Sequence, residues 1–190
     1  MTRIISGFAG SLALKVPKAG TRPTSDRVRE AIFSSLDAID AIHGARVLDL
    51  YAGSGALGLE ALSRGAATVT LVERGKDAAD ICRANTRAVL AGVRDRTPGE
   101  VRVEHRSVRL FLEGAAGAWD LVFIDPPYDL DEAALAGDLA LLAPLLADDA
   151  MVMVERSSRS PEPSWPTGIA LERRRDYGET TLWWAERPAD

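Results

Sequence analysis

Short apolar runs alternate with amphipathic stretches along most of the 190-residue chain. The apolar runs predict β-strands, and the stretches between them repeat their apolar residues at helical spacing. The predicted strands cover 47–50, 69–73, 101–105, 120–125 and 150–155. Of the predicted helices, two begin near 57 and 76, a short one follows 105, and another covers 132–146. Strands that alternate with helices are typical of a parallel sheet covered on both faces, so the pattern predicts an α/β fold.

The two ends of the chain depart from this alternation. Residues 3–16 alternate loosely around Ala9-Gly10, which predicts a two-stranded β-hairpin arm within residues 1–20. Near the other end, the runs 169–173 and 180–185 have no helix between them, so we expect a hairpin whose last strand is antiparallel to its neighbour. The remaining residues, 21–190, are predicted to form one domain.

A further helix is predicted between the arm and the first strand. Thr24 or Ser25 can cap its start, and its apolar positions recur every four residues, at Val28, Ile32 and Leu36. We expect this helix to end near Gly44.

Composition narrows the class of protein. Cys82 is the single cysteine, which excludes a disulfide within the chain and a cysteine-rich zinc site. The two histidines, His43 and His105, do not occur at metal-ligand spacing, so no metal is expected. No apolar run is long and uncharged enough for a signal peptide or a membrane span. These features predict a soluble, cytoplasmic protein, which we expect to be a monomer.

The charge is unevenly distributed. The net charge is -5, yet residues 1–35 carry six basic residues and two acidic ones. A basic arm on an acidic body could bind nucleic-acid phosphates, although a solvated face beside an ordinary helix gives the same pattern. The candidates for phosphate contact are Arg3, Lys15, Lys18, Arg22 and Arg27.

A glycine-rich turn follows the first predicted strand. Gly53 and Gly55 permit a tight turn and close approach of a ligand to bare backbone, while Gly58 lets the helix pack closely on the strand. Glu73 lies twenty residues after Gly53, where an acid can accept hydrogen bonds from ribose hydroxyls. The turn also matches a dinucleotide-binding fingerprint, so an NAD-type oxidoreductase remains an alternative.

Asp49 favours a different cofactor. It stands four residues before Gly53, in a region where dinucleotide sites hold a pyrophosphate that a carboxylate would repel. S-adenosylmethionine has no phosphate and carries an ammonium group that this carboxylate can bind. The turn is therefore interpreted as an S-adenosylmethionine site.

A second motif, Asp125-Pro126-Pro127-Tyr128, ends the predicted strand 120–125. Ligands bind at the carboxyl ends of strands in open α/β sheets, so both motifs are predicted to share one crevice. An exocyclic base amine is a poor nucleophile, and acceptors on its N–H bonds, such as the Asp125 carboxylate and the Pro126 carbonyl, would activate it. The prolines stiffen the turn, and Tyr128 offers a face for stacking on an extruded base.

These motifs, together with three further runs, resemble the bacterial RsmD family of methyltransferases, which modify guanine N2 in small-subunit ribosomal RNA. The further runs are Arg3-Ile4-Ile5-Ser6-Gly7, the stretch from Arg22-Pro23-Thr24 to Phe33, and Tyr177-Gly178. The resemblance covers nearly the whole chain. It implies the class I, Rossmann-like methyltransferase fold, with a seven-stranded, mostly parallel sheet and an antiparallel last strand, and 16S rRNA as partner.

The resemblance also assigns roles to residues. Asp125, Pro126, Pro127 and Tyr128 form the amine-binding turn, and the cofactor contacts are Asp49, Ala52, Gly53, Gly55, Glu73, Arg74, Ser107 and Val108. Family members usually have an acid after the third strand that meets the cofactor's adenine amine, whereas this chain has Ser107 there. The Ser107 hydroxyl or the Val108 backbone is expected to take over that contact.

Two other functions stay open beside the oxidoreductase. An adenine or cytosine amino methyltransferase acting on DNA would use the same proline-containing turn. A non-catalytic RNA-binding module could retain a cofactor pocket without transferring a methyl group.

Overall fold

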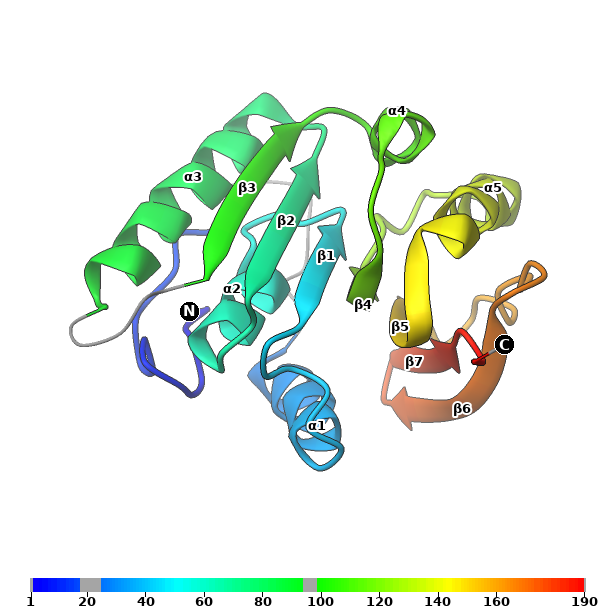
Figure 1. Ribbon diagram of the computed structural model, residues 1–190, viewed down its shortest axis with the longest axis horizontal. Helices are drawn as coiled ribbons and strands as arrows, with labels where there is room; N and C mark the ends of the chain where they lie inside the picture. Colours follow the sequence, from blue (N-terminus) through cyan, green and yellow to red (C-terminus); the bar gives the residue numbers. More distant parts are fainter. Residues whose placement is uncertain (1, 18–24, 94–98, 190) are drawn as a thin grey trace.

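The computed structural model describes residues 2–17, 25–93 and 99–189, and its centre is a seven-stranded sheet (Figure 1). The strand order is β3-β2-β1-β4-β5-β7-β6. The strands are β1 (Arg46–Leu50), β2 (Thr68–Glu73), β3 (Glu100–His105), β4 (Trp119–Ile124), β5 (Leu146–Ser157), β6 (Ala170–Tyr177) and β7 (Thr180–Glu186). Strands β1 to β5 pair in parallel, while β7 is antiparallel to both β5 and β6. The predicted parallel sheet and antiparallel last strand are confirmed.

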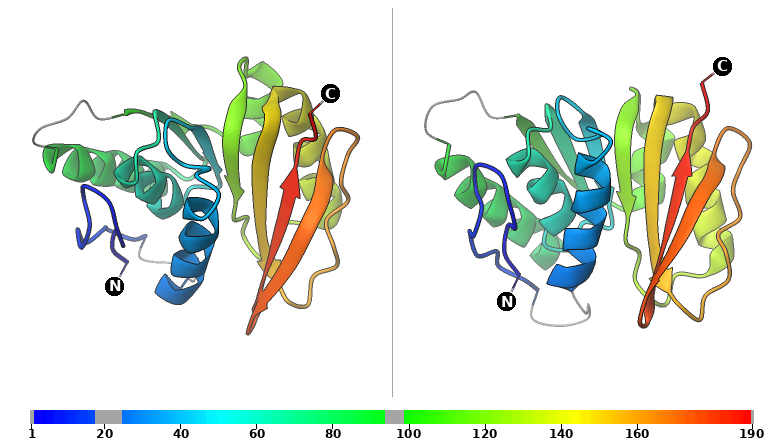
Figure 2. Two further views of the ribbon diagram at one scale, coloured as in Figure 1. Left: turned by 60° about the horizontal axis from the view of Figure 1, so that its bottom comes forward. Right: turned by 90° about the horizontal axis from the view of Figure 1, so that it is seen from below.

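Helices cover both faces of the sheet (Figure 2). They are α1 (Asp26–Asp37), α2 (Ala56–Ser63), α3 (Lys76–Ala91), α4 (Val108–Gly114), α5 (Glu132–Leu142) and a 3-10 turn, η1 (Ala143–Leu145). Buried residues of α1, α2 and α3 form one core with one face of the sheet, and those of α4 and α5 form a second core with the other face. None of the helices in the described ranges is long and apolar enough to span a membrane.

Side-chain alternation along the strands assigns residues to the two cores. In β4, Leu121 and Phe123 join the first core, while Val122 and Ile124 join the second. The same alternation continues through the other central strands. Because both faces are covered, most of these positions are apolar, which explains the nearly continuous apolar runs in the sequence.

Two predicted helix ends were wrong. Helix α1 ends at Asp37 rather than near Gly44, because Asp40 adopts a left-handed conformation (φ 52°) and Ile42 then turns back into the core. Helix α5 ends at Leu142 rather than at 146, because Pro144 has no amide hydrogen to continue the helical hydrogen bonds. The chain passes through η1 directly into β5.

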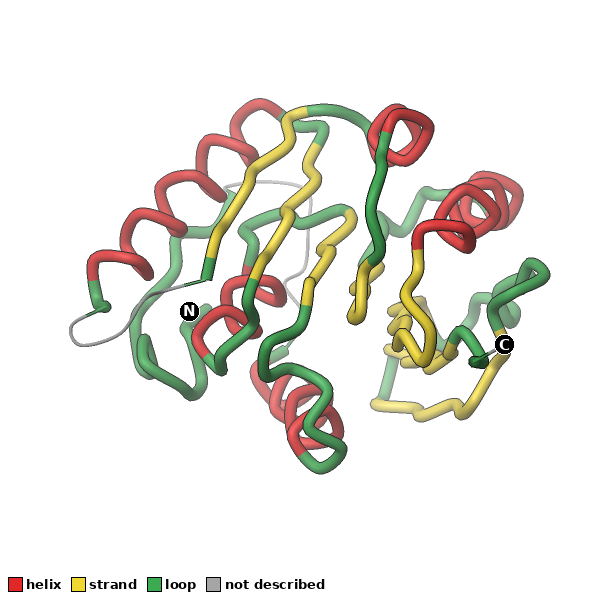
Figure 3. Tube along the Cα trace, in the orientation of Figure 1, coloured by secondary structure: helices red, strands yellow, loops and turns green. Residues whose placement is uncertain are grey.

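The N-terminal segment doubles back as expected but forms a loop with a single antiparallel bridge, between Arg3 and Ala13, rather than two strands (Figure 3). It lies on the side of the sheet covered by α1, α2 and α3 (Figure 2). The fully buried Glu60 of α2 accepts hydrogen bonds from the backbone amides of Ile5 and Ser6, at 2.6 and 3.0 Å. The Asn85 side chain of α3 accepts a hydrogen bond from the Lys15 amide and donates one to the Lys15 carbonyl. The segment is therefore packed against the domain along most of its length.

Candidate active site

A cavity of about 580 Å³ opens at the carboxyl ends of the parallel strands. Two turns form much of its wall: the glycine turn (residues 51–55) after β1 and the proline turn (residues 125–128) after β4. Strands β1 and β4 are hydrogen-bonded neighbours in the centre of the sheet, with Leu50 paired with Ile124. The two motifs therefore meet in one crevice, as the sequence predicted.

Four carboxylates gather at this edge of the sheet. Asp49, Glu73, Asp125 and Glu155 all line the cavity. Two positions before each acid is a residue of the core that packs under α1, α2 and α3. These core residues are Val47, Leu71, Phe123 and Met153, in the same order as the acids. Because side chains two apart on a strand share a face, the four acids lie on one side of the sheet. Such a concentration of negative charge favours a cationic ligand or one rich in hydrogen-bond donors.

Asp49 is the most deeply buried of these acids, with 1% of its surface exposed. Its Oδ2 accepts a hydrogen bond from the Gly58 amide at 2.9 Å. Burial, together with the nearby charges of Asp125 and Glu73, raises the pKa of Asp49 to about 7 despite the opposing effect of the Gly58 hydrogen bond. A cationic group beside Asp49 would offset the cost of ionising it there.

Glu73 links the glycine turn to the loop between β2 and α3. Its two carboxylate oxygens accept hydrogen bonds from the amides of Gly53 and Gly75, at 2.9 and 2.6 Å. Cys82 packs beneath the turn, with its thiol donating to the Gly53 carbonyl at 3.2 Å. Burial raises the pKa of Cys82, so the residue is a buried neutral thiol, as expected for a core position.

Glycines serve different purposes in and after this turn. Gly53 lines the cavity, and a Cβ there would have open space around it except for the Tyr51 carbonyl at 3.9 Å. Gly55, in contrast, is absent from the cavity lining and caps α2 in a left-handed conformation (φ 77°). A Cβ on Gly58 would lie 2.5 Å from Leu71 Cδ2 and 2.8 Å from Val69 Cγ1, so this glycine is required for close packing of α2 on the sheet.

Ser107 and Val108 begin α4 at the far end of the cavity, and Ala52 and Arg74 also line it. The Ser107 hydroxyl caps α4 by accepting from the Leu110 amide at 3.3 Å. Val108 is the first residue of the helix, so its amide has no intrahelical acceptor. Both groups can therefore bind a polar ligand edge at this position.

The proline turn is more open to solvent. Pro126 is buried, Asp125 and Pro127 are half-buried, and Tyr128 is 69% exposed. A hydrogen bond from the Leu130 amide to the Pro127 carbonyl, at 3.0 Å, closes the turn. The buried Arg156 of β5 supports it by donating to the Leu130 carbonyl at 3.0 Å and by pairing with Glu132.

Several lining residues were missed from the sequence, among them Tyr51, Asp138 and Glu155. Tyr51 has a positive φ of 62° and donates its hydroxyl to the Asp138 carboxylate, a contact that joins the glycine turn to α5. Burial raises the pKa of both groups above the ordinary values. Asp138 was visible as an acid within an otherwise apolar helix. Glu155 ends a predicted strand as Asp125 does, a signal that the sequence analysis did not use.

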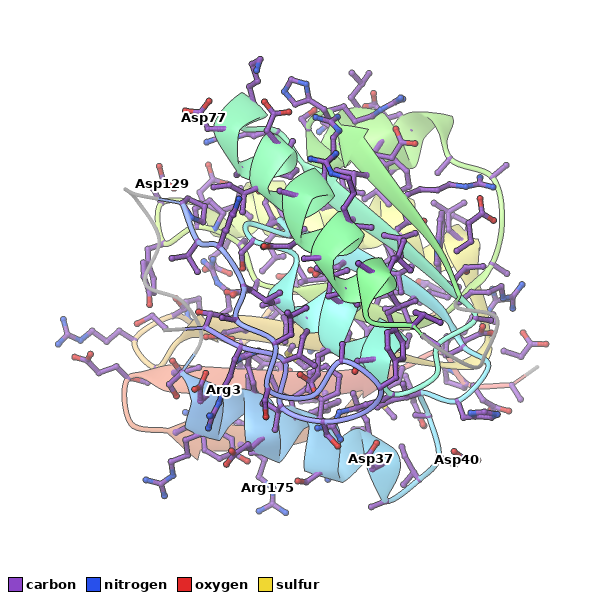
Figure 4. The ribbon with its side chains drawn as sticks, turned by 90° about the vertical axis from the view of Figure 1, so that its left-hand side faces the viewer. Arg3, Asp37, Asp40, Asp77, Asp129 and Arg175 are labelled. Carbon is purple, nitrogen blue, oxygen red and sulfur yellow. The ribbon has the colours of Figure 1, made fainter. Side chains whose placement is uncertain are left out.

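The expected phosphate-binding residues that the structure describes do not line the cavity. Arg3, Lys15 and Arg27 are exposed and do not line it, and Figure 4 shows Arg3 over α1, away from Asp129, which does. Lys18 and Arg22 lie outside the described residues. The buried Arg29 connects α1 to the N-terminal segment by donating to the Arg3 carbonyl at 2.8 Å. Within the described ranges no group of three or more His, Cys, Asp or Glu side chains is placed to hold a metal ion.

The chain is similar to several known proteins over nearly its whole length. A family model described as "Conserved hypothetical protein 95" matches residues 2–186. The "Ribosomal RNA small subunit methyltransferase D" of Escherichia coli K12 is 36% identical over 190 residues, which is 98% of this chain and 90% of that protein.

Solved structures agree with the sequence match. The Escherichia coli protein yhhF superposes with a TM-score of 0.85 and 34% identity, over 100% of this chain and 99% of that one. The magnesium protoporphyrin IX methyltransferase of Synechocystis, solved with bound S-adenosylmethionine, superposes with a TM-score of 0.64 over 85% of this chain and 78% of that one. At 14% identity the latter match shows the fold alone. The predicted class I methyltransferase fold is confirmed.

Proposed function

The chain belongs to the Conserved hypothetical protein 95 family, the RsmD family that its motifs resemble, and from this premise we propose that it methylates small-subunit ribosomal RNA. The methyl donor is S-adenosylmethionine and the acceptor is the exocyclic N2 amine of a guanine in 16S rRNA. The observation that carries the proposal is the shared cavity, which brings the glycine turn and the proline turn together.

The cofactor fits the chemistry of the glycine-turn side. A sulfonium and an ammonium group are both cationic, and Asp49 and Glu73 supply carboxylates on the same face of the sheet. Asp49 binds the ammonium group, Glu73 accepts from the ribose hydroxyls, and Ser107 with the Val108 amide holds the adenine edge. When bound, the cofactor supplies a methyl group on a sulfonium, which is already a good leaving group.

The proline turn activates the target amine. The Asp125 carboxylate and the Pro126 carbonyl accept hydrogen bonds from the two N–H groups of the amine. These bonds localise the nitrogen lone pair for attack on the methyl group. Tyr128 stacks on the extruded base, and its 69% exposure leaves the ring face accessible to a polymer. The positive charge formed on the amine is stabilised by Asp125 until its proton leaves to solvent.

The RNA partner is assigned to the basic N-terminal side of the molecule. Arg3, Lys15 and Arg27 are exposed there, on α1 and the segment packed beside it, and they supply phosphate contacts outside the cavity. We propose phosphate contacts for Lys18 and Arg22 as well, from their place in the sequence alone. We assign the enzyme to the cytoplasm, where it acts as a monomer on ribosomal RNA within a small-subunit particle.

The test is transfer of labelled methyl from S-adenosylmethionine to total RNA, to small-subunit particles and to DNA, followed by analysis of the modified nucleoside. The proposal expects N2-methylguanosine in small-subunit RNA. A label in N6-methyladenine or N4-methylcytosine of DNA would support a DNA amino methyltransferase instead. Absence of transfer to any polymer, with cofactor binding intact, would indicate a non-catalytic module.

A further inference from the structure

The three bases with exocyclic amines differ in the ring nitrogen that lies beside the amine on the Watson–Crick edge. In guanine that position is N1–H, a hydrogen-bond donor. In adenine it is N1 and in cytosine it is N3, both of which are acceptors without a hydrogen. A carboxylate placed beside the amine site would therefore accept from guanine and would meet a lone pair in the other two bases. The acceptors of the proline turn cannot make this distinction, because they contact only the amine, and Tyr128 can stack on any base.

Glu155 is a carboxylate in the required place. Ile124 of β4 pairs with Val154 of β5, so Asp125 and Glu155 follow as the next neighbours on adjacent parallel strands. Both acids lie on the face of the sheet that carries Phe123 and Met153. Glu155 lines the main cavity together with Asp125, Pro126 and Tyr128, and the same four residues line a smaller hollow beside it.

The structure fixes the position of Glu155 firmly. The residue lies within β5, between β4 on one side and β7 on the other, and it pairs with Leu182 of β7. It is 8% exposed, whereas Tyr128 across the hollow is 69% exposed. The next residue, Arg156, points to the opposite face and is held by the Leu130 carbonyl and Glu132. A buried carboxylate on a central strand is a rigid acceptor, and such acceptors discriminate strongly between ligands with and without a donor.

We infer that Glu155 selects guanine, by accepting the N1–H of the target base while Asp125 and the Pro126 carbonyl accept its two amine hydrogens. This inference rests on the proposed function and adds to it a residue that chooses the base. Guanine then presents three adjacent N–H donors to three acceptors, of which Glu155 lies within β5 and the other two directly follow β4. Adenine and cytosine each leave Glu155 facing a ring lone pair, which is repulsive.

The test compares guanosine with 2-aminopurine riboside at the target position, in the RNA that the wild-type protein methylates. 2-Aminopurine keeps the amine, but its N1 carries no hydrogen. The wild type is expected to prefer guanosine by about 100-fold or more in kcat/KM, because a site built to bind a donor rejects an analogue that lacks it. Glu155→Gln offers an amide N–H to that nitrogen, so it is expected to reduce the preference at least tenfold, a change of about 1.4 kcal/mol.

Glu172→Gln, on an exposed position of β6, is the matched control and should keep the wild-type preference. Binding of S-adenosylhomocysteine and the melting temperature show whether Glu155→Gln is folded. An unchanged preference in a folded Glu155→Gln variant overturns the inference, whatever its absolute rate. So does a wild type that methylates 2-aminopurine as well as guanosine, a result that requires no variant. Failure of the wild type to methylate guanosine in any RNA would instead overturn the proposed function.

Discussion

The glycine turn and the proline turn face each other across one cavity but are held in different ways. Around the glycine turn, the carboxylates of Asp49 and Glu73 accept hydrogen bonds from backbone amides at 2.6 to 2.9 Å. The thiol of Cys82 donates to the carbonyl of Gly53 in the turn. Around the proline turn, stiffness comes from the two consecutive prolines, and Tyr128 projects into solvent.

The difference follows from the sizes of the proposed ligands. A small cofactor can be enclosed, so its side of the cavity can be built in advance from backbone hydrogen bonds. A base that is still attached to a polymer must enter from outside, so its side has to stay open. Substitutions on the two sides should therefore separate: those at the proline turn should affect methyl transfer, and those near the glycine turn should affect cofactor binding and stability.

Asp125→Ala is the strongest test of this separation. Loss of the acceptor on the target amine should lower kcat by about 10²- to 10³-fold, in the range observed when one preorganised transition-state contact is removed. Calorimetry with S-adenosylhomocysteine should show unchanged affinity. Asp148→Ala, on the exposed start of β5, is the control and should be as active as the wild type. Full activity in Asp125→Ala would show that the amine is bound elsewhere.

Tyr128→Ala should come next in size. Loss of base stacking, about 1 to 3 kcal/mol, corresponds to roughly 5- to 150-fold in kcat/KM for RNA. Tyr128→Phe keeps the aromatic face and should retain most of the activity. Equal losses in the two variants would point to the hydroxyl rather than to stacking. Affinity for S-adenosylhomocysteine should not change in either.

Gly58→Ala tests the other side of the cavity. The added Cβ would lie 2.5 Å from Leu71 Cδ2 and 3.2 Å from Asp49 Oδ2, so the buried Leu71 side chain or α2 must move, which disturbs the surroundings of Asp49. Overpacking of this kind costs about 1 to 3 kcal/mol, which thermal or denaturant unfolding can measure. Affinity for S-adenosylhomocysteine should fall as well. Gly137→Ala in α5, where a Cβ meets only Arg109 Nη1 at 3.8 Å, should be neutral or slightly stabilising.

The pH dependence of cofactor binding should report on Asp49. Its pKa is raised to about 7 in the folded protein, so the ligand-free protein holds this proton between the unfolded value of 3.8 and 7. The stability that this proton contributes is present below pH 3.8 and is lost as the pH rises through 7. Binding of an ammonium group requires the ionised form, so affinity for S-adenosylhomocysteine should fall up to tenfold per pH unit below about 7.

Asp49→Asn tests whether Asp49 is the group that causes this pH dependence. The amide cannot ionise, so the pH dependence of both cofactor affinity and unfolding between pH 3.8 and about 7 should flatten. A variant that keeps the wild-type pH profile would assign the titration to another group.

The smallest effects are expected from the basic N-terminal side. Replacing Arg3, Lys15 and Arg27 by Gln should weaken RNA binding and lower the slope of log affinity against log salt by about 0.7 to 0.9 for each phosphate that the variant no longer neutralises. Arg102→Gln, on an exposed position of β3, is the control and should leave the slope unchanged. Deletion of residues 1–16 is a poorer test, because it would leave the buried Glu60 without its partners Ile5 and Ser6. An unaltered slope in the triple variant would remove these residues from the RNA surface.

The sequence predicted the architecture well because strand and helix patterns are local. The runs ending at Leu50 and Ile124 identified the central strands, and the motifs after them predicted the crevice. Helix ends were less predictable, since the left-handed turn at Asp40 depends on how Ile42 packs. The Tyr51–Asp138 contact spans 87 positions, and the hydrogen bonds of Glu60 to the N-terminal segment span more than 50. No local pattern encodes such pairings.

The place of β7 in the sheet has a consequence for biosynthesis. β7 lies between β5 and β6, yet it is translated after both of them. Until it emerges, β5 presents an unpaired hydrogen-bonding edge, and Trp183 and Trp184 are missing from the two cores. The half of the sheet that carries the glycine turn can assemble earlier on the ribosome, from strands already made. The wall that holds Glu155 is therefore completed last.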